Sequence, residues 1–142
     1  MSTNRQFEYK RFECLKGREL GLFCIKDETI AAVDEDFLEY LKRNCQCMDD
    51  VHLEHALYLL EKANLKAAYP FVANYIDYPV TYVRMPAIRF LSQWENNYEV
   101  DDAVLNDPLI IRKVEKTVKE HSDLMGVDEL KHILEKKRTI EQ

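Results

Sequence analysis

The sequence predicts an all-α protein, and three observations support this prediction. Apolar residues make up 46% of the 142 residues and charged residues 32%, which is the balance of a folded globular chain. Only three glycines and four prolines interrupt the chain. From residue 34 onward, apolar side chains recur at spacings of three, four and seven, as on one face of a helix. This length suits one domain of ordinary size, so we expect a single helical domain over residues 1–142.

Capping residues indicate where these helices begin and end. Asp34 precedes a segment with acidic residues in its first turn, basic residues in its last and an apolar face between them. Later segments repeat these signals, and we expect a cap at Asp49 or Asp50 with an end at Asn64, a cap at Asp107 with Pro108 in the first position, and a last helix near 128–138. Between them, an apolar stripe that begins at Val83 and ends at Trp94 predicts a buried helix face.

Residues 1–33 show weaker signals than the rest of the chain. Phe7 and Tyr9 alternate as in a strand, whereas Phe7 and Cys14 have helical spacing, and Gly17 and Gly21 interrupt both patterns. We expect one or two short helices here, forming an N-terminal cap on helical repeats that cover 34–138.

An internal repeat supports this organisation. When the sequence is shifted by 31 residues, Ala56, Leu59 and Leu60 fall on Ala87, Phe90 and Leu91. A second shift, of about 28 residues, brings the Val-Arg pair at 83–84 onto the Ile-Arg pair at 111–112. Periods near 30 residues with two helices each are typical of helical solenoids.

The stretch LKAAYPFVANYIDYPVTYVRMPAIRFL, residues 65–91, resembles a HEAT-type repeat. The resemblance implies a right-handed α-solenoid of antiparallel helix pairs, with about seven to eight helices in this chain. It implies that Pro70 and Pro79 lie in a first turn or a linker, and that Pro86 bends the second helix. It also implies a polar contact between Asp77 and Arg84 within the repeat.

The charge of the chain limits the kind of partner. Its formal net charge of −6 and isoelectric point near 5.3 oppose binding to nucleic acid, because Lys and Arg supply most of the affinity for phosphates. A basic protein would suit it better, although a mild acidic surplus also serves solubility alone. The N-terminal stretch lacks the apolar core of a signal peptide, and no run is apolar enough for a membrane span. We therefore expect a cytoplasmic protein with reduced cysteines and no membrane partner.

Four residues of metal-binding type lie close together in the sequence: Cys45, Cys47, His52 and His55. Their spacing differs from that of structural zinc sites, and the helix that carries the histidines needs its apolar face for the core. We expect no metal and no other cofactor. Cys45 should be a small buried side chain and Cys47 should lie in a turn, with both histidines at the surface.

Motifs for catalysis are equally scarce. The chain contains no glycine-rich phosphate loop, and HLEH at 52–55 differs from the zinc-protease motifs. It also has no His-Glu dipeptide, which iron-binding HEAT-repeat hydroxylases use, and it lacks the basic charge of HEAT-like DNA glycosylases. A cysteine nucleophile paired with His121 or His132 stays open, but nothing positions one. We therefore expect a protein without enzymatic activity.

Aromatic and acidic residues are the remaining candidates for a binding role. Three of the eight tyrosines cluster around Asp77, and tyrosine is frequent in binding hot spots, although half of them could simply complete the core. Small acidic HEAT-like proteins resemble bacterial immunity proteins, which neutralise a toxin that is often a nuclease. This resemblance implies a partner-binding face, for which the candidates are Asp34, Glu35, Asp36, Tyr75, Asp77, Tyr78, Tyr82, Asp101 and Asp102. The alternative is a HEAT-repeat enzyme, a scaffold subunit or a chaperone similar to a chromophore lyase.

Overall fold

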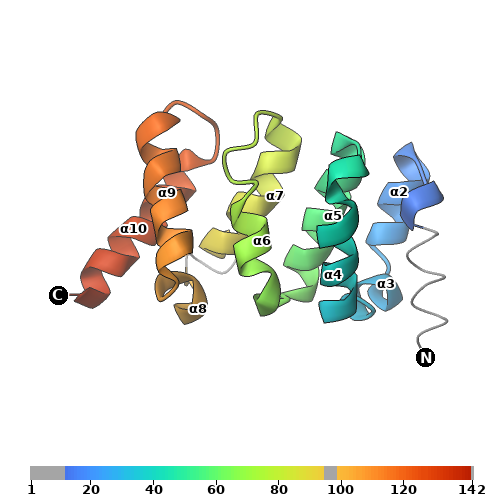
Figure 1. Cartoon of the computed structure of the whole chain (residues 1–142), viewed down its shortest axis with the longest axis horizontal. Coiled ribbons are helices and arrows are strands. Elements are labelled where there is room, and N and C mark those ends of the chain that lie inside the picture. Colours follow the sequence, from blue (N-terminus) through green and yellow to red (C-terminus); the bar gives the residue numbers. More distant parts are fainter. Residues whose placement is uncertain (1–11, 95–98, 142) are drawn as a thin grey trace. The chain divides into compact units, whose positions relative to one another are not determined.

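The structure is a computed structural model that describes residues 12–94 and 99–141, and this part of the chain contains helices and no strand. The all-α prediction is therefore confirmed. The helices are α2 (Gly17–Cys24), α3 (Asp27–Ala31), α4 (Glu35–Asn44), η1 (Cys45–Cys47), α5 (Asp50–Ala63), η2 (Lys66–Ala68), α6 (Tyr69–Ala73), α7 (Thr81–Ser92), α8 (Asp102–Leu105), α9 (Pro108–Glu120) and α10 (Val127–Glu141) (Figure 1). None of the helices described here has both the length and the apolar character needed to cross a bilayer.

The predicted caps form as the sequence indicates. The carboxylates of Asp34, Asp49 and Asp107 each accept a hydrogen bond from a backbone N–H in the first turn of α4, α5 and α9. Asn64 ends α5 with a φ of 51°, a left-handed conformation that asparagine tolerates better than most residues. Asp101 caps α8 in the same way, but the sequence did not predict this helix because four residues are too few to show a helical period.

The chain forms two compact units, Met1–Leu65 and Lys66–Gln142. In the first unit, α2 and α3 both contact α5, so the expected short helices near the N-terminus are present. The predicted pattern at Phe7 and Tyr9 lies outside the described residues. The first aromatic side chain that the structure describes, Phe12, is 1% exposed and packs edge-on against Phe37, with 6.0 Å between the ring centroids.

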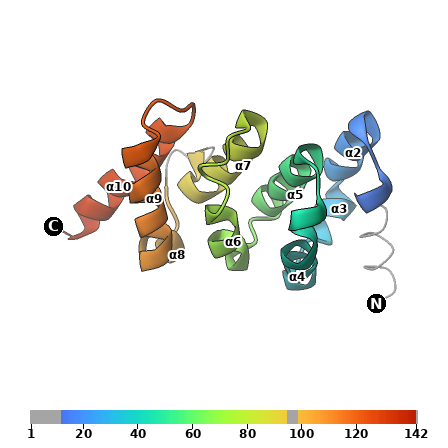
Figure 2. The same ribbon diagram turned by 45° about the horizontal axis from the view of Figure 1, so that its top comes forward.

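In the second unit, four helices contact one another in two pairs. The α6 helix lies against α7 and α9, and the α10 helix lies against α7 and α9 (Figures 1 and 2). Their contact faces are the apolar stripes of the sequence, and the core residues Val72, Ala87, Leu91, Val114 and Leu130 are fully buried. The loop between α6 and α7 and the loop between α9 and α10 lie at the same end of this unit, whereas α8 lies at the other end (Figures 1 and 2).

The prolines of the second unit take the predicted positions. Pro70 lies in the first turn of α6, where a missing N–H costs no helical hydrogen bond, and Pro79 lies in the loop before α7. Pro86 is buried within α7 itself. The expected burial of Trp94 is wrong, because this side chain is 40% exposed. Gln93 ends α7 with a φ of 53°, so Trp94 no longer continues the buried stripe of that helix.

Candidate functional site

The loop between α6 and α7 presents a row of aromatic rings. The ring centroid of Tyr75 lies 5.4 Å from that of Phe71 and 5.7 Å from that of Tyr78. Both distances are typical of stabilising aromatic pairs. Tyr82 follows in the first turn of α7 and is 46% exposed. The structure thus keeps all three predicted binding tyrosines in one short segment, and the rings of Tyr75 and Tyr78 lie against each other.

Arg84 is the residue that holds this loop in place. Its side chain is only 2% exposed, although Arg84 follows the exposed Tyr82 by only two residues. One terminal nitrogen donates to the backbone carbonyls of Tyr78 at 2.8 Å and Pro79 at 3.4 Å, and the other donates to the hydroxyl of Thr81 at 3.2 Å. Such charge-assisted hydrogen bonds are stronger than neutral ones. The guanidinium therefore fixes the backbone on which the tyrosines are mounted.

The predicted contact between Asp77 and Arg84 is wrong. Asp77 instead accepts a hydrogen bond from the ammonium group of Lys113 in α9, with 2.7 Å between Nζ and Oδ2. Both side chains are 29% exposed, so this is a half-buried ion pair. The loop folds so that its carbonyls, not its carboxylate, face Arg84. Asp77 is consequently committed to an internal pair and is a weaker candidate for partner binding than its position in the sequence indicates.

The loop between α9 and α10 lies next to the first loop. Arg84 reaches it as well, because its Nε donates to the carbonyl of Met125 at 3.2 Å. Gly126 has a φ of 97°, and a side chain at this position would come within 2.8 Å of Met85 and Ile88 in α7. The loop therefore lies close against α7 while the side chain of Met125 remains 67% exposed.

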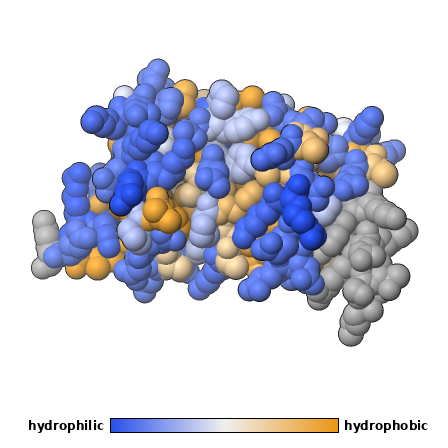
Figure 3. Space-filling view, in the orientation of Figure 1, coloured by the Kyte–Doolittle hydropathy of each residue, from blue (hydrophilic) through white to orange (hydrophobic). Residues whose placement is uncertain are grey.

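We call residues 74–83 and 120–130 the two-loop surface. Its exposed apolar and aromatic area comes from Tyr82 and Met125, with Tyr75 and Tyr78 partly exposed beside them. Over the loop between α6 and α7, the space-filling view is pale, which marks residues of intermediate hydropathy (Figure 3). Apart from the buried Arg84 at its edge, the surface is without Lys or Arg, and its acidic residues are Asp77, Glu120, Asp123, Asp128 and Glu129.

The other predicted binding residues do not join this surface. Asp101 caps α8 and forms an ion pair with Lys66, with 2.9 Å between Nζ and Oδ2. The hydrogen bond from the N–H of Ala103, and then Lys66, lowers the pKa of Asp101 below its ordinary value. Because α8 lies at the far end of the second unit, Asp101 and the exposed Asp102 are separated from the tyrosines (Figure 1).

Asp34, Glu35 and Asp36 belong to the first unit, where Asp34 caps α4 and the other two are exposed. Residues 27–41 contain six acidic residues and no Lys or Arg. None of the large hydrophobic side chains that are exposed among the described residues lies in this stretch.

The sequence analysis did not identify Met125 and Asp123 as binding candidates. The signal that could have identified them is the lack of any Lys or Arg in residues 120–130.

A pocket of about 360 Å³ lies in the first unit between the residues before α2, the end of α4 and the start of α5. Its lining combines aromatic, charged and sulfur-containing side chains, namely Phe12, Glu13, Lys16, Tyr40, Asn44, Cys47, Met48, Asp49 and His52. The hydroxyl of Tyr40 donates to the carboxylate of Glu13 at 2.5 Å. A thiol, an imidazole and a carboxylate in one pocket make this the place where a catalytic site would be sought.

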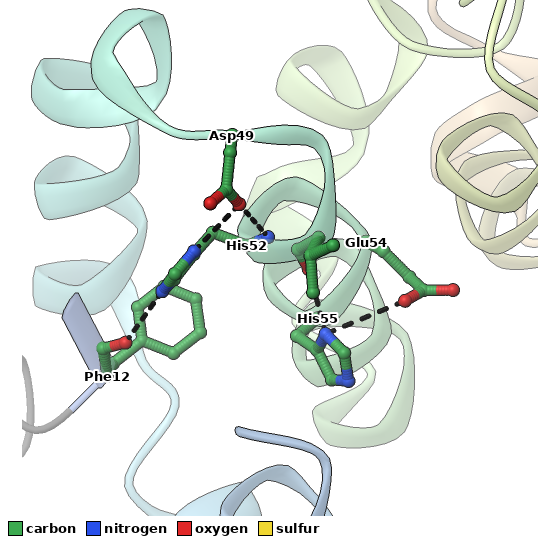
Figure 4. A network of polar contacts seen from close by, with 6 residues as sticks. Phe12, Asp49, His52, Glu54 and His55 are labelled. Carbon is green, nitrogen blue, oxygen red and sulfur yellow. Dashed lines mark hydrogen bonds and ion pairs between the residues drawn. The ribbon is translucent and has the colours of Figure 1, made fainter. Parts of the chain in front are cut away.

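The two nitrogens of the His52 ring are both engaged within this pocket (Figure 4). Nδ1 lies 2.8 Å from Oδ1 of Asp49, and Nε2 lies 3.1 Å from the backbone carbonyl oxygen of Phe12. A base that activates Cys47 would need one nitrogen free to accept the thiol proton. Hydrogen bonds from the backbone N–H and then the ring of His52 lower the pKa of Asp49. His52 therefore links the backbone of Phe12 to Asp49 at the start of α5, and neither of its ring nitrogens is left to act as a catalytic base.

Two expectations about the Cys and His residues are wrong. The His52 side chain is 10% exposed, not at the surface, because the ring of Phe12 packs edge-on against it at 5.4 Å. Cys45 is only partly buried, and the buried cysteine is Cys24, whose thiol pKa burial raises to about 12. In the described part of the chain, no three His, Cys, Asp or Glu side chains come together as ligands of a metal ion would.

No protein-family model matches the chain, and comparison with curated proteins and with solved structures finds no match either. The function proposed below therefore depends on the residues of this chain.

Proposed function

We propose that this protein is a non-enzymatic binding module that blocks a basic protein partner, as an immunity protein blocks a toxin such as a nuclease. The observation that supports this proposal is the grouping of exposed acids into stretches without Lys or Arg. Residues 27–41 form one such stretch in the first unit, and the two-loop surface forms the other in the second unit. Carboxylates grouped in this way attract a positively charged cleft and accelerate its association.

The distribution of charge along the chain strengthens the proposal. Residues 1–65, the first unit, contain thirteen acidic and nine basic residues, for a formal charge of −4. Residues 66–142 contain thirteen acidic and eleven basic residues, for a formal charge of −2. The acidic surplus is therefore larger in the first unit than in the second, although the first unit is the shorter of the two.

The geometry of the pocket supports a role without catalysis. Both ring nitrogens of His52 lie within hydrogen-bonding distance of an oxygen, from Asp49 on one side and Phe12 on the other, so neither is directed at Cys47. The alternative function, a HEAT-repeat enzyme or a scaffold or chaperone subunit, would have its best site in this pocket. It would be favoured if a small molecule bound there.

We also propose that the helices form a HEAT-like solenoid. In the second unit, α6 and α7 make one pair and α9 and α10 the next, with α6 against α9 and α7 against α10. Stacked helical hairpins of a solenoid make contacts of this kind, in which each helix meets its counterpart in the next repeat. The exposed loops at one end of such hairpins are common binding sites.

Purification of the native complex, followed by association kinetics, tests the proposed function. We expect a basic protein to co-purify with the chain and its association rate to fall steeply as salt increases. In the variant Glu35→Gln/Asp36→Asn, association should be slower and less dependent on salt. A variant with the same loss of acidic charge on α10, Glu135→Gln/Glu141→Gln, is the control and should behave as wild type. An acidic partner, or association that salt leaves unchanged, would contradict the proposal.

A further inference from the structure

We infer that the two-loop surface of the second unit is the main binding surface for the partner. It would receive an apolar side chain of the partner that is flanked by Lys or Arg. This inference rests on the proposed function and identifies its site. Of the two acidic stretches, only the two-loop surface combines carboxylates with large exposed side chains, those of Tyr82 at 46% and Met125 at 67%. Residues 27–41 offer charge alone and would steer the partner without holding it.

The apolar centre of this surface is rigid before a partner arrives. Arg84 donates to the carbonyls of Tyr78, Pro79 and Met125, so one buried side chain joins the two loops. Lys113 ties the first loop to α9 through Asp77, and Gly126 allows the second loop to lie close against α7. A surface that is already ordered loses little conformational entropy on binding. Arg84 is thus a positioning residue for the binding surface.

The charges around this centre determine the chemistry of the partner. Asp77 is paired with Lys113, and the 85% exposed Asp128 is paired with Lys131 at 3.4 Å, whereas Glu120 and Asp123 are exposed near Met125 in the sequence. No Lys or Arg lies within either segment of the surface. An acidic or phosphorylated partner would be repelled. In a basic segment with one apolar side chain, the basic residues would meet the carboxylates of the rim and the apolar side chain would pack on the centre.

Peptide titrations of the full chain, labelled with ¹⁵N and followed by NMR, test this inference. The probe is a ten-residue peptide with one leucine between two lysines and two arginines, and its two controls replace the leucine with glycine or the basic residues with glutamate. We expect shifts in residues 75–82 and 121–129 for the probe, at least fivefold weaker binding for the glycine control and no shifts for the glutamate control. The variant Met125→Ala should weaken binding of the probe at least threefold. Leu109→Ala, at an apolar side chain that is 70% exposed at the start of α9, should leave binding unchanged.

The positions of the shifts distinguish failure of this inference from failure of the proposed function. Chemical-shift changes confined to residues 27–41 would contradict the two-loop surface as the main binding surface, but would still agree with a basic partner. Equal binding of the leucine and glycine peptides would overturn the apolar centre, and so would an absence of shifts with the probe. The proposed function itself fails if no protein co-purifies with the chain, if the natively purified partner is acidic, or if its association rate does not depend on salt.

Discussion

The Nε atom of Arg84 lies 3.2 Å from the backbone carbonyl oxygen of Met125, which is forty-one residues further along the chain. The same guanidinium donates to the carbonyl of Tyr78 at 2.8 Å, and the side chain is 2% exposed. All its acceptors are neutral oxygens, so backbone dipoles and a hydroxyl, not a carboxylate, stabilise the buried charge. Arg84 therefore has a structural role, which is to hold two loops of the second unit together.

Replacement of Arg84 should destabilise the protein strongly. In Arg84→Ala the loop carbonyls lose their donor, and buried acceptors without a partner are costly. We expect the free energy of unfolding to fall by about 3 kcal/mol. Urea denaturation followed by circular dichroism measures this change. Arg112→Ala, at an exposed arginine of α9, is the matched control and should change the stability by less than about 0.5 kcal/mol. Equal stability of the two variants would show that Arg84 does not hold the loops.

A pair of glycine substitutions tests the close approach of the second loop to α7. Gly126 has a φ of 97°, and an added Cβ would lie 2.8 Å from side-chain atoms of Met85 and Ile88. Gly17 has a φ of 55° with open space around it. We expect Gly126→Ala to lower the free energy of unfolding by about 2 kcal/mol or more, and Gly17→Ala by about 1 kcal/mol. Thermal unfolding of both variants shows which of them is destabilised more. A larger loss of stability in Gly17→Ala than in Gly126→Ala would contradict the close packing at Gly126.

Acid should weaken the fold through the capping carboxylates. The pKa of Asp49 and that of Asp101 are both lowered in the folded chain, from an ordinary value of 3.8. A carboxyl whose pKa is lowered by folding stabilises the folded chain at pH values above its ordinary pKa. This stability is lost as the pH falls through the pKa of the folded state. The melting temperature should therefore decline below about pH 4.

The variant Asp101→Asn isolates one of these two contributions. Asparagine can still cap α8, but it cannot titrate or form the ion pair with Lys66. We expect this variant to show a smaller decline in melting temperature below about pH 4 than the wild type. Asp102→Asn, at the exposed neighbouring carboxylate, should follow the wild-type curve. A decline as steep in Asp101→Asn as in the wild type would contradict the assignment.

The cysteines should differ in their reaction with a thiol reagent. Cys14 and Cys47 are exposed, whereas Cys24 is fully buried and its pKa is raised to about 12. The thiolate is the reactive form, so Cys24 should react only when the chain unfolds. Mass spectrometry after brief treatment with iodoacetamide, with and without urea, locates the labelled residues. Labelling of Cys24 in the folded protein within the same time as Cys47 would contradict its burial.

The sequence alone determined the features that depend on near neighbours in the chain. Asp34, Asp49 and Asp107 cap their helices because a carboxylate at the N-cap reaches a backbone N–H two or three residues later. Asn64 ends α5 because asparagine tolerates a left-handed conformation. The apolar stripes predicted the buried faces of α4, α5, α7 and α9 for the same reason, since a helical period repeats within a few residues.

The tertiary structure decided which partners the polar side chains take. Asp77 pairs with Lys113 and Arg84 reaches Met125 because α9 and its following loop pack beside α6 and α7, and a repeat pattern in the sequence does not encode these distances. His52 is buried because Phe12, forty residues earlier, offers both a ring and a carbonyl. Helical periodicity specifies which face of a helix is buried, whereas the identity of each contact depends on the packing of segments distant in the chain.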